Sequence, residues 1–261
     1  MKVGEISYTN FLPIFHGVNR VKLEREHGIS FVKGVPAVLN KKMKEKQLDV
    51  SGMSLYAYLE NEEQYELISP FCVGSDGGVG SITLFSKFPL RSLDHKRVAV
   101  TNTSATSVGL LKIILKTFFQ FENAFTVSDP CLPTMMKHHD AALLIGDDAI
   151  KHRKDTNYYQ YDLGSLWKEQ TGLPMVFAVL AKQKNVNIPP VLVQEMEQSL
   201  AACYKDSFHR LINEIEDASL DRLFWENYFQ NALSYELTPR HVESINLYKT
   251  FAAFPTKQEK M

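Results

Sequence analysis

Short apolar runs alternate with amphipathic segments along most of this chain, and that alternation is typical of α/β proteins. The apolar runs are expected to form strands, because they are short and bounded by turn-forming residues. The predicted strands cover residues 2–7, 29–33, 48–50, 67–73, 81–86, 97–100, 141–145, 158–162 and 175–180, with a turn at Gly52.

The amphipathic segments predict helices. One helix begins after Ser104, because an apolar stripe follows at helical spacing, formed by Val108, Leu111, Leu115 and Phe118. The final third of the chain is predicted to be helical, with one face formed by Val193, Met196, Leu200 and Cys203. Other helices are expected at residues 12–19, 36–46, 223–225 and 245–254.

The strands fall into two sets, and residues 85–89 and 177–180 have the character of crossings between them. We therefore predict an α/β fold with two lobes, each a mainly parallel sheet flanked by helices. The first lobe is discontinuous, with residues 1–86 and a largely helical part at 180–261; residues 87–179 form the inserted second lobe. Ligands of such folds bind at the carboxyl ends of parallel strands, so we expect a ligand cleft between the lobes.

The segment Thr101–Ser107 is rich in hydroxyl groups and connects a predicted strand to a predicted helix. Hydroxyls and free backbone N–H groups therefore meet where the helix dipole is positive, which suits a carboxylate or a phosphate. This reasoning makes Ser104, Ala105, Thr106 and Ser107 candidate binding residues. The alternative is a well-capped helix without a ligand, since Ser and Thr are common caps.

Other polar residues follow strands at the edge where the cleft is expected. The Asn10 amide offers a donor and an acceptor to a ligand, and Ser7 and Tyr8 lie beside it. Asn10 could instead cap the next helix, as a residue of that type often does. Three more candidates, Gly34, Ser54 and Tyr56, follow the second and third strands, where an ordinary turn or loop is the alternative reading.

The Gly-rich segment 75–82 precedes a strand, whereas a dinucleotide-binding loop follows a strand and precedes a helix. We therefore expect these glycines to let the backbone bend or approach a ligand, with Ser81 and Ile82 near the cleft. Gly146 and Asp147 end another buried strand. Asp147 is either a ligand-binding or catalytic carboxylate or a cap of the short helix that follows.

Composition narrows the possible partners. A chain of 261 residues with a net charge of −1 has no global field to attract nucleic acid or an anionic membrane. Neither a secretory signal nor a span of bilayer length is recognisable, and the three isolated cysteines suit a reducing compartment, so we expect a cytoplasmic protein. Neither the cysteines nor the adjacent His138 and His139 show the ligand spacing of a zinc site, and no cofactor motif is present; metal and cofactor are therefore not expected.

Taken in order, these segments resemble the chorismate dehydratase family of the futalosine route to menaquinone. The resemblance is carried by residues 7–10 (Ser-Tyr-Thr-Asn), 34–36 (Gly-Val-Pro), 80–82 (Gly-Ser-Ile), 104–107 (Ser-Ala-Thr-Ser), 143–147 (Leu-Leu-Ile-Gly-Asp), 161–167 (Tyr-Asp-Leu-Gly-Ser-Leu-Trp) and 171–178 (Thr-Gly-Leu-Pro-Met-Val-Phe-Ala). It covers about the first two-thirds of the chain strongly, and it implies a fold similar to type II periplasmic solute-binding proteins. A sister family of the same route opens with a Ser-Pro-Cys-Pro-Asn-Asp-type segment, which residues 7–10 do not match.

The resemblance also implies a reaction. Chorismate would lose water and become 3-[(1-carboxyvinyl)oxy]benzoate, with Asn10 and Ser81 at the reacting centre and Ser104, Thr106 and Ser107 on one carboxylate. Because these segments contain no evident general base, our hypothesis is that the substrate's enolpyruvyl carboxylate takes the C3 proton. The competing interpretation is a cytoplasmic solute-binding or sensor protein that binds a small carboxylate without turning it over.

Overall fold

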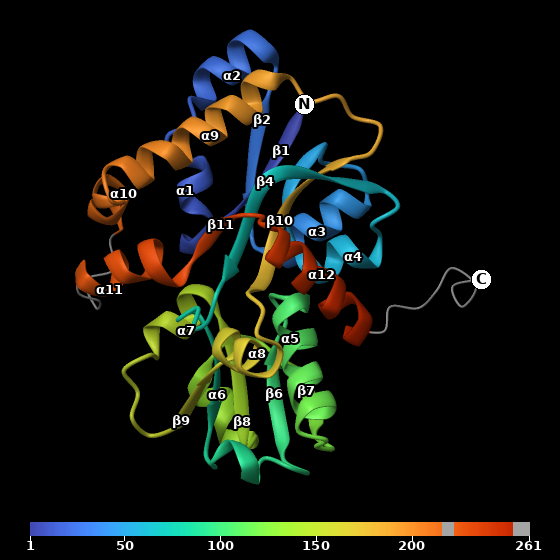
Figure 1. Cartoon of the computed structure of the whole chain (residues 1–261), viewed down its shortest axis with the longest axis vertical. Helices are drawn as coiled ribbons and strands as arrows, with labels where there is room; N and C mark the ends of the chain where they lie inside the picture. The colour runs from blue at the N-terminus through green and yellow to red at the C-terminus, as the bar shows by residue number, and fades with distance from the viewer. Residues whose placement is uncertain (216–221, 253–261) are drawn as a thin grey trace.

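The computed structural model describes residues 1–215 and 222–252, which form two β-sheets with helices around them (Figure 1). The first sheet has the order β11-β4-β10-β3-β1-β2 and the second β7-β6-β8-β5-β9. The first sheet contains β1 (Lys2–Ile6), β2 (Ser30–Gly34), β3 (Val50–Ser54), β4 (Tyr65–Ser75), β10 (Met175–Gln183) and β11 (Ser234–Glu236). The second contains β5 (Ile82–Ser86), β6 (Arg97–Thr101), β7 (Ala124–Ser128), β8 (Ala141–Ile145) and β9 (Tyr159–Asp162).

The predicted two-lobed α/β architecture is confirmed, but the sheets are mixed and not mainly parallel. β1 is parallel to β2 and β3, and β6 is parallel to β7 and β8. By contrast, β10 is antiparallel to β3 and β4, and β5 is antiparallel to β8 and β9. Strand direction depends on the route of the intervening chain, which hydrophobic patterning does not report.

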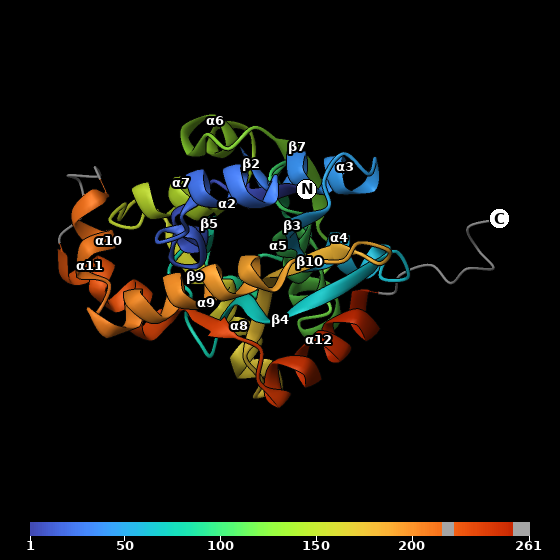
Figure 2. The same cartoon turned by 90° about the horizontal axis from the view of Figure 1, so that it is seen from above.

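Helices at opposite sides of the molecule come from different parts of the chain. In Figures 1 and 2, α10 and α11 lie on one side and α3 and α4 on the other. The α-helices are α1 (Leu12–Phe15), α2 (Arg20–His27), α3 (Pro36–Lys44), α4 (Leu55–Glu60), α5 (Ala105–Lys112), α6 (Leu132–His138), α7 (Gly146–Lys151), α8 (Leu163–Thr171), α9 (Pro190–Lys205), α10 (His209–Glu214), α11 (Arg222–Asn227) and α12 (Pro239–Ala252). Short 3₁₀ turns are η1 (Thr9–Phe11) and η2 (Leu90–Ser92), and π-helical turns are η3 (Ile113–Phe118) and η4 (Tyr228–Ala232).

Most expected elements are present with shifted ends. The apolar stripe after Ser104 is confirmed in α5 and η3, where Leu111 and Leu115 are buried. The turn predicted at Gly52 is wrong: Gly52 lies inside β3, where a Cβ atom would come within 2.8 Å of the Phe11 ring. The helix predicted over 12–19 ends at Phe15, and the helix predicted over 245–254 starts earlier, at Pro239, while residues 253–254 lie outside the described residues.

The crossings between the sheets differ from the predicted boundaries. Ile82–Ser86 was expected in the first lobe, but β5 pairs with β8 and β9 of the second sheet. Residues 175–179 were expected in the second lobe, but β10 pairs with β3 and β4 of the first. The chain therefore crosses at residues 76–81 and 172–174, because strand pairing and not strand position decides sheet membership.

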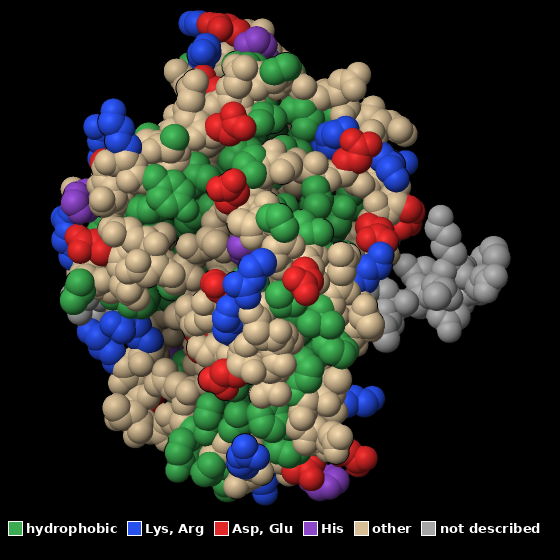
Figure 3. Space-filling model, in the orientation of Figure 1, with side chains coloured by type: hydrophobic (Ala, Val, Ile, Leu, Met, Phe, Trp, Pro, Cys, Tyr) green, Lys and Arg blue, Asp and Glu red, His purple; other side chains and the backbone are tan. Residues whose placement is uncertain are grey.

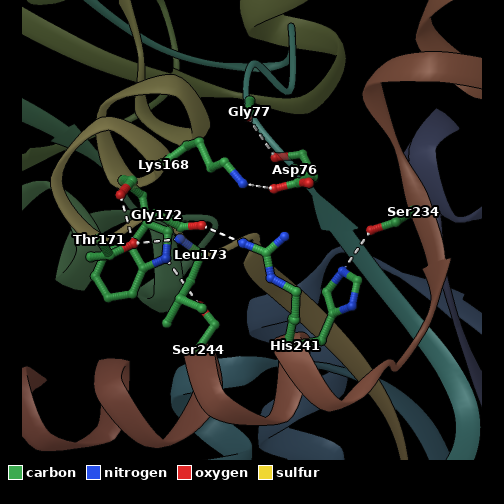
Figure 4. A network of polar contacts seen from close by, with 12 residues as sticks. Asp76, Gly77, Lys168, Thr171, Gly172, Leu173, Ser234, His241 and Ser244 are labelled. Carbon is green, nitrogen blue, oxygen red and sulfur yellow. Dashed lines mark hydrogen bonds and ion pairs between the residues drawn. The ribbon is translucent and has the colours of Figure 1, made fainter.

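A polar network beside both crossings attaches α12 to the rest of the molecule (Figure 4). Lys168 of α8 forms an ion pair with Asp76 of the first crossing. Arg240 of α12 donates to the Gly172 carbonyl oxygen of the second crossing at 2.5 Å. One turn along α12, Ser244 Oγ accepts from Trp167 Nε1 of α8 at 3.0 Å. Helix α12 thus helps to set the relative position of the two sheets.

Charge is dispersed over the surface. Figure 3 shows Lys and Arg side chains interspersed with Asp and Glu on the visible face, so that face has no continuous basic area. Among the helices of residues 1–215 and 222–252, none combines the length and the apolar character that crossing a bilayer requires.

We expect Ser244→Ala to lower the free energy of unfolding by about 1–3 kcal/mol, because the buried Trp167 N–H would lose its acceptor. Urea unfolding monitored by circular dichroism measures this loss. Thr250→Ala on the exposed face of the same helix is the control and should change stability by less than about 0.5 kcal/mol. Equal effects of the two substitutions would contradict the assigned role of Ser244.

Candidate functional site

A narrow cavity of about 30 Å³ lies between the two sheets, near the carboxyl ends of β1, β3 and β8. Its walls come from both sheets, as expected for a cleft between lobes. The lining residues are Ile6, Tyr8, Asn10, Phe11, Pro36, Ser54, Ile82, Ser104, Ser107, Ile145, Gly146, Phe177 and Ala178.

Several predicted binding residues meet in this cavity even though they are far apart in the sequence. Tyr8, Asn10 and Ser54 come from the first-sheet side, and Ile82, Ser104, Ser107 and Gly146 from the second. The Asn10 amide forms no hydrogen bond with any residue in the described ranges. It therefore presents a free donor and a free acceptor to a ligand.

Helix starts provide the partial positive charge of the site. Ser104 caps α5, its Oγ accepting from the Ser107 N–H at 3.4 Å, and both residues line the cavity. Pro36, the first residue of α3, lines it from the other lobe. Two helix N-termini therefore meet at one cavity, an arrangement that stabilises a carboxylate or another small anion.

Two close contacts shape the walls. Ser54 Oγ accepts from Asn40 Nδ2 at 2.9 Å, so the Ser54 side chain is held by α3. Gly146 has a φ of +56°, and a Cβ atom there would lie 3.2 Å from the Tyr8 ring. Glycine is required at this position because the backbone is left-handed and the aromatic ring packs directly against it.

Ser7 and Gly34 are the first of the predicted contacts that lie outside the cavity lining. Ser7 is exposed, and its N–H donates to the Gly34 carbonyl oxygen at 3.0 Å. This bond extends the pairing between β1 and β2 by one residue. Ser7 and Gly34 therefore help to hold the strand ends in place, but neither is among the residues that line the cavity.

The proposed carboxylate contact of Thr106 is wrong. Its side chain is fully buried, and its Oγ1 accepts from the Tyr56 N–H at 2.9 Å. Its carbonyl oxygen accepts from the Tyr248 hydroxyl at 3.0 Å. Thr106 thus joins α5 to α4 and α12, because its side chain faces the packed interior and is not among the residues that line the cavity.

Tyr56 and Ala105 line a larger groove of about 640 Å³ beside the cavity. Ser104 borders both spaces. Lys112 and Lys116 of the second lobe contribute positive charge to this groove. These residues therefore lie at an approach to the cavity and not on its walls.

Ser81 and Asp147 lie immediately behind the lining. Ser81 is fully buried, and its carbonyl oxygen accepts from the Gly146 N–H at 2.7 Å. Asp147 is half-buried at the start of α7, next to Thr9 of the other lobe. Burial raises the pKa of Asp147, Asp148 raises it further, and the Thr9 hydroxyl and N–H oppose the rise.

Sequence reasoning missed the apolar walls formed by Ile6, Phe11, Ile145, Phe177 and Ala178. The signal available was position, since Ile6 and Ile145 end β1 and β8. None of the lining residues is Lys, Arg, Asp, Glu or His. Within residues 1–215 and 222–252, no group of three His, Cys, Asp or Glu side chains is arranged to hold a metal ion.

Comparison with known proteins agrees with this geometry. Residues 1–253 match the model of a protein family described as menaquinone biosynthesis. The chain belongs to this family. It is 32% identical to a chorismate dehydratase of Thermus thermophilus over 243 residues, covering 85% of this chain and 82% of that protein. It is 30% identical to a 1,4-dihydroxy-6-naphtoate synthase of the same organism over 186 residues, covering 70% of this chain and 66% of the relative.

Solved structures support the fold. A crystal structure of an Archaeoglobus fulgidus protein covers 96% of both chains at 20% identity, with a TM-score of 0.77. A Candida albicans protein described as having the generic periplasmic binding protein structural fold has a TM-score of 0.61 at 10% identity, covering 98% of this chain and 91% of its own. The predicted periplasmic-binding-protein-like architecture is therefore confirmed.

Asp147 should make stability depend on pH. Because its pKa is raised from the ordinary 3.8, the folded state keeps a proton that the unfolded state loses, so stability falls as the pH rises through this range. Asp147→Asn cannot ionise and should unfold at a higher urea concentration than the wild type at neutral pH. This advantage should shrink as the pH falls towards about 4. A difference that does not change with pH would contradict the assignment.

Proposed function

We propose that this protein is a chorismate dehydratase, a lyase that eliminates water from chorismate to give 3-[(1-carboxyvinyl)oxy]benzoate. The observation that carries the proposal is the unpartnered Asn10 amide in a cavity where the N-termini of α3 and α5 meet. Chorismate carries two carboxylates and a hydroxyl group, which suit neutral donors and helix dipoles. The relative with that activity also spans more of the chain than the naphthoate synthase does.

The naphthoate synthase activity is the less favoured assignment. We assign the naphthoate synthase to the sister family of the same route, which opens with a Ser-Pro-Cys-Pro-Asn-Asp-type segment. This chain has Ser-Tyr-Thr-Asn at residues 7–10 instead. Tyr8 and Asn10 of this segment line the cavity, so the difference lies at the site itself.

Orientation and proton handling are the main requirements of the reaction. C3 loses a proton, C4 loses hydroxide, and aromatisation of the ring makes the product strongly favoured. We assign one substrate carboxylate to Ser104 and Ser107 at the start of α5, and the reacting centre to Asn10. Because no lining side chain is acidic or basic near neutral pH, the substrate's enolpyruvyl carboxylate is assigned as the acceptor of the C3 proton. His16 is not a competing base, because it lies outside the lining and bonds Glu214 at 2.9 Å.

Substrate entry requires the lobes to separate. The cavity volume of about 30 Å³ is comparable with that of one water molecule, far less than a ring with two carboxylates. A hinge motion at residues 76–81 and 172–174 would widen the cleft and close it again over the substrate. We also expect the protein in the cytoplasm, a location supported by its three free cysteines.

We expect the purified protein to convert chorismate into a product that is lighter by one water, detected by mass spectrometry. If chorismate raises the melting temperature but is recovered unchanged, the solute-binding or sensor interpretation is correct instead.

Asn10→Ala should lower kcat by about 100- to 1,000-fold, the usual effect of losing one donor at a reacting centre. Melting temperature should stay near that of the wild type, because Asn10 bonds no described residue. Asn185→Ala, at an exposed turn distant from the site in sequence, is the matched control and should keep full activity. Unchanged kinetics of the Asn10 variant would refute its role.

Chorismate esterified at the enolpyruvyl carboxylate should bind but not react, because an ester cannot accept the C3 proton. Steady-state assays with the ester measure this directly, and inhibition of chorismate turnover reports its binding. Turnover of the ester would show that a protein group or water is the base.

A further inference from the structure

Tyr228 of η4 brings the C-terminal helical part of the chain close to Ser81. Tyr228 is buried, and its ring lies against the first crossing, where a Cβ atom on Gly80 would be 3.7 Å from Tyr228 Cδ2. Its hydroxyl lies close enough to Ser81 for the serine to lower its pKa, although burial raises that pKa more strongly. The Ser81 carbonyl oxygen accepts from the N–H of Gly146, and Gly146 lines the cavity. Because Tyr228 packs next to Ser81, it lies behind the cavity wall.

Buried polar atoms without well-directed hydrogen bonds gather at this end of the cavity. Within the described ranges, no partner of good geometry exists for Tyr8 Oη, Ser81 Oγ, Asp147 Oδ1 or Tyr228 Oη. Three of these residues adjoin Gly146: Tyr8 packs on it, the Ser81 carbonyl oxygen accepts from its N–H, and Asp147 follows it in the chain. The fourth, Tyr228, packs beside Gly80, the residue before Ser81. Buried polar atoms of this kind destabilise a fold, so a cluster of them indicates a place where a polar group is bound.

Tyr228 is linked to the second lobe through its neighbour Phe224. The Arg153 guanidinium at the end of α7 lies 4.1 Å from the centre of the Phe224 ring, which stacks on Tyr228. The π-helical turn that begins at Tyr228 follows directly on α11, and such turns are frequent at functional sites.

We propose that Tyr228 is a positioning residue of the site, which orients the Ser81 hydroxyl toward the oxygen leaving C4 of chorismate. This inference rests on the proposed dehydratase function. In that step the C4–O bond breaks and its electron pair leaves with the oxygen. The proton taken from C3 by the substrate carboxylate joins this oxygen, and water departs. With chorismate bound, the Ser81 hydroxyl donates a hydrogen bond to this oxygen while negative charge develops on it. The adjacent Tyr228 hydroxyl then donates to Ser81 Oγ and so fixes the Ser81 rotamer.

Tyr235 provides a matched control within the same segment. It is fully buried and its hydroxyl also has no partner in the described part of the chain. Its electrostatic neighbours are Tyr228, Tyr204, Cys203 and Cys72, and it does not border the cavity. Removing either hydroxyl deletes the same chemical group from a buried site, but only Tyr228 adjoins Ser81.

The test compares Tyr228→Phe with Tyr235→Phe in the full-length protein. Tyr228→Phe should lower kcat by about 10- to 100-fold with KM changed less than about twofold, as expected when an interaction made only in the transition state is lost. Tyr235→Phe should keep wild-type kinetics, and neither substitution should lower the melting temperature, because each removes an unpartnered buried hydroxyl. Ser81→Ala should lower kcat similarly. The double variant Ser81→Ala/Tyr228→Phe should have a kcat no lower than that of the less active single variant, since both residues act on the same hydrogen bond.

Equal activity of Tyr228→Phe and Tyr235→Phe, or independent effects of Ser81 and Tyr228, would overturn the inference and leave the dehydratase function standing. Failure of the wild type to convert chorismate would overturn that function separately. In that case the chorismate-induced rise in melting temperature is compared between the two tyrosine variants. A smaller rise for Tyr228→Phe supports contact between this pair and the ligand, and equal rises, or none in the wild type, overturn it.

Discussion

The hydrogen bonds at Thr106 join the two lobes, and the geometry of the cavity depends on them. The Thr106 hydroxyl accepts from Tyr56 at the start of α4, and its carbonyl oxygen accepts from the hydroxyl of Tyr248 on α12. Ser104 and Ser107, on the same turn of α5, face the cavity. The first turn of α5 therefore has two roles: Thr106 bonds the other lobe, and Ser104 and Ser107 line the cavity. Displacing α5 would disturb both together.

Helix α12 extends this connection to both crossings. Its residues bond Gly172, Trp167 and Thr106, all of which precede it by dozens of residues in the chain. The contacts lie on elements of the second lobe, although the strand before α12 belongs to the first sheet. If the lobes separate by a hinge motion, these hydrogen bonds either break or move together with α12. Breaking them would add to the free energy that separation costs.

Electrostatics at the cavity come from dipoles and not from ionised side chains. Its lining contains no charged residue, while the carboxyl of Asp147, which follows the lining residue Gly146, has a pKa raised by burial. Fixed dipoles in a poorly hydrated cleft require little reorganisation when charge moves on a bound molecule. The net charge of −1 agrees with this arrangement, because attraction of an anion has to be local.

Most of the buried strands, the capped start of α5 and the polar residues at strand ends could be predicted from the sequence, whereas β7, β11, α2 and α6 were not. Local periodicity, turn chemistry and capping decide these features, and neighbouring residues suffice to express them. Strand direction, the sheet to which β5 and β10 belong, and the orientation of Thr106 were decided only by tertiary structure. Each depends on which distant segments pack together: β5 enters the second sheet because β8 and β9 flank it. Likewise, the sequence predicted a turn at Gly52, but Gly52 lies inside β3. Glycine is needed there because the Phe11 ring packs directly against the backbone.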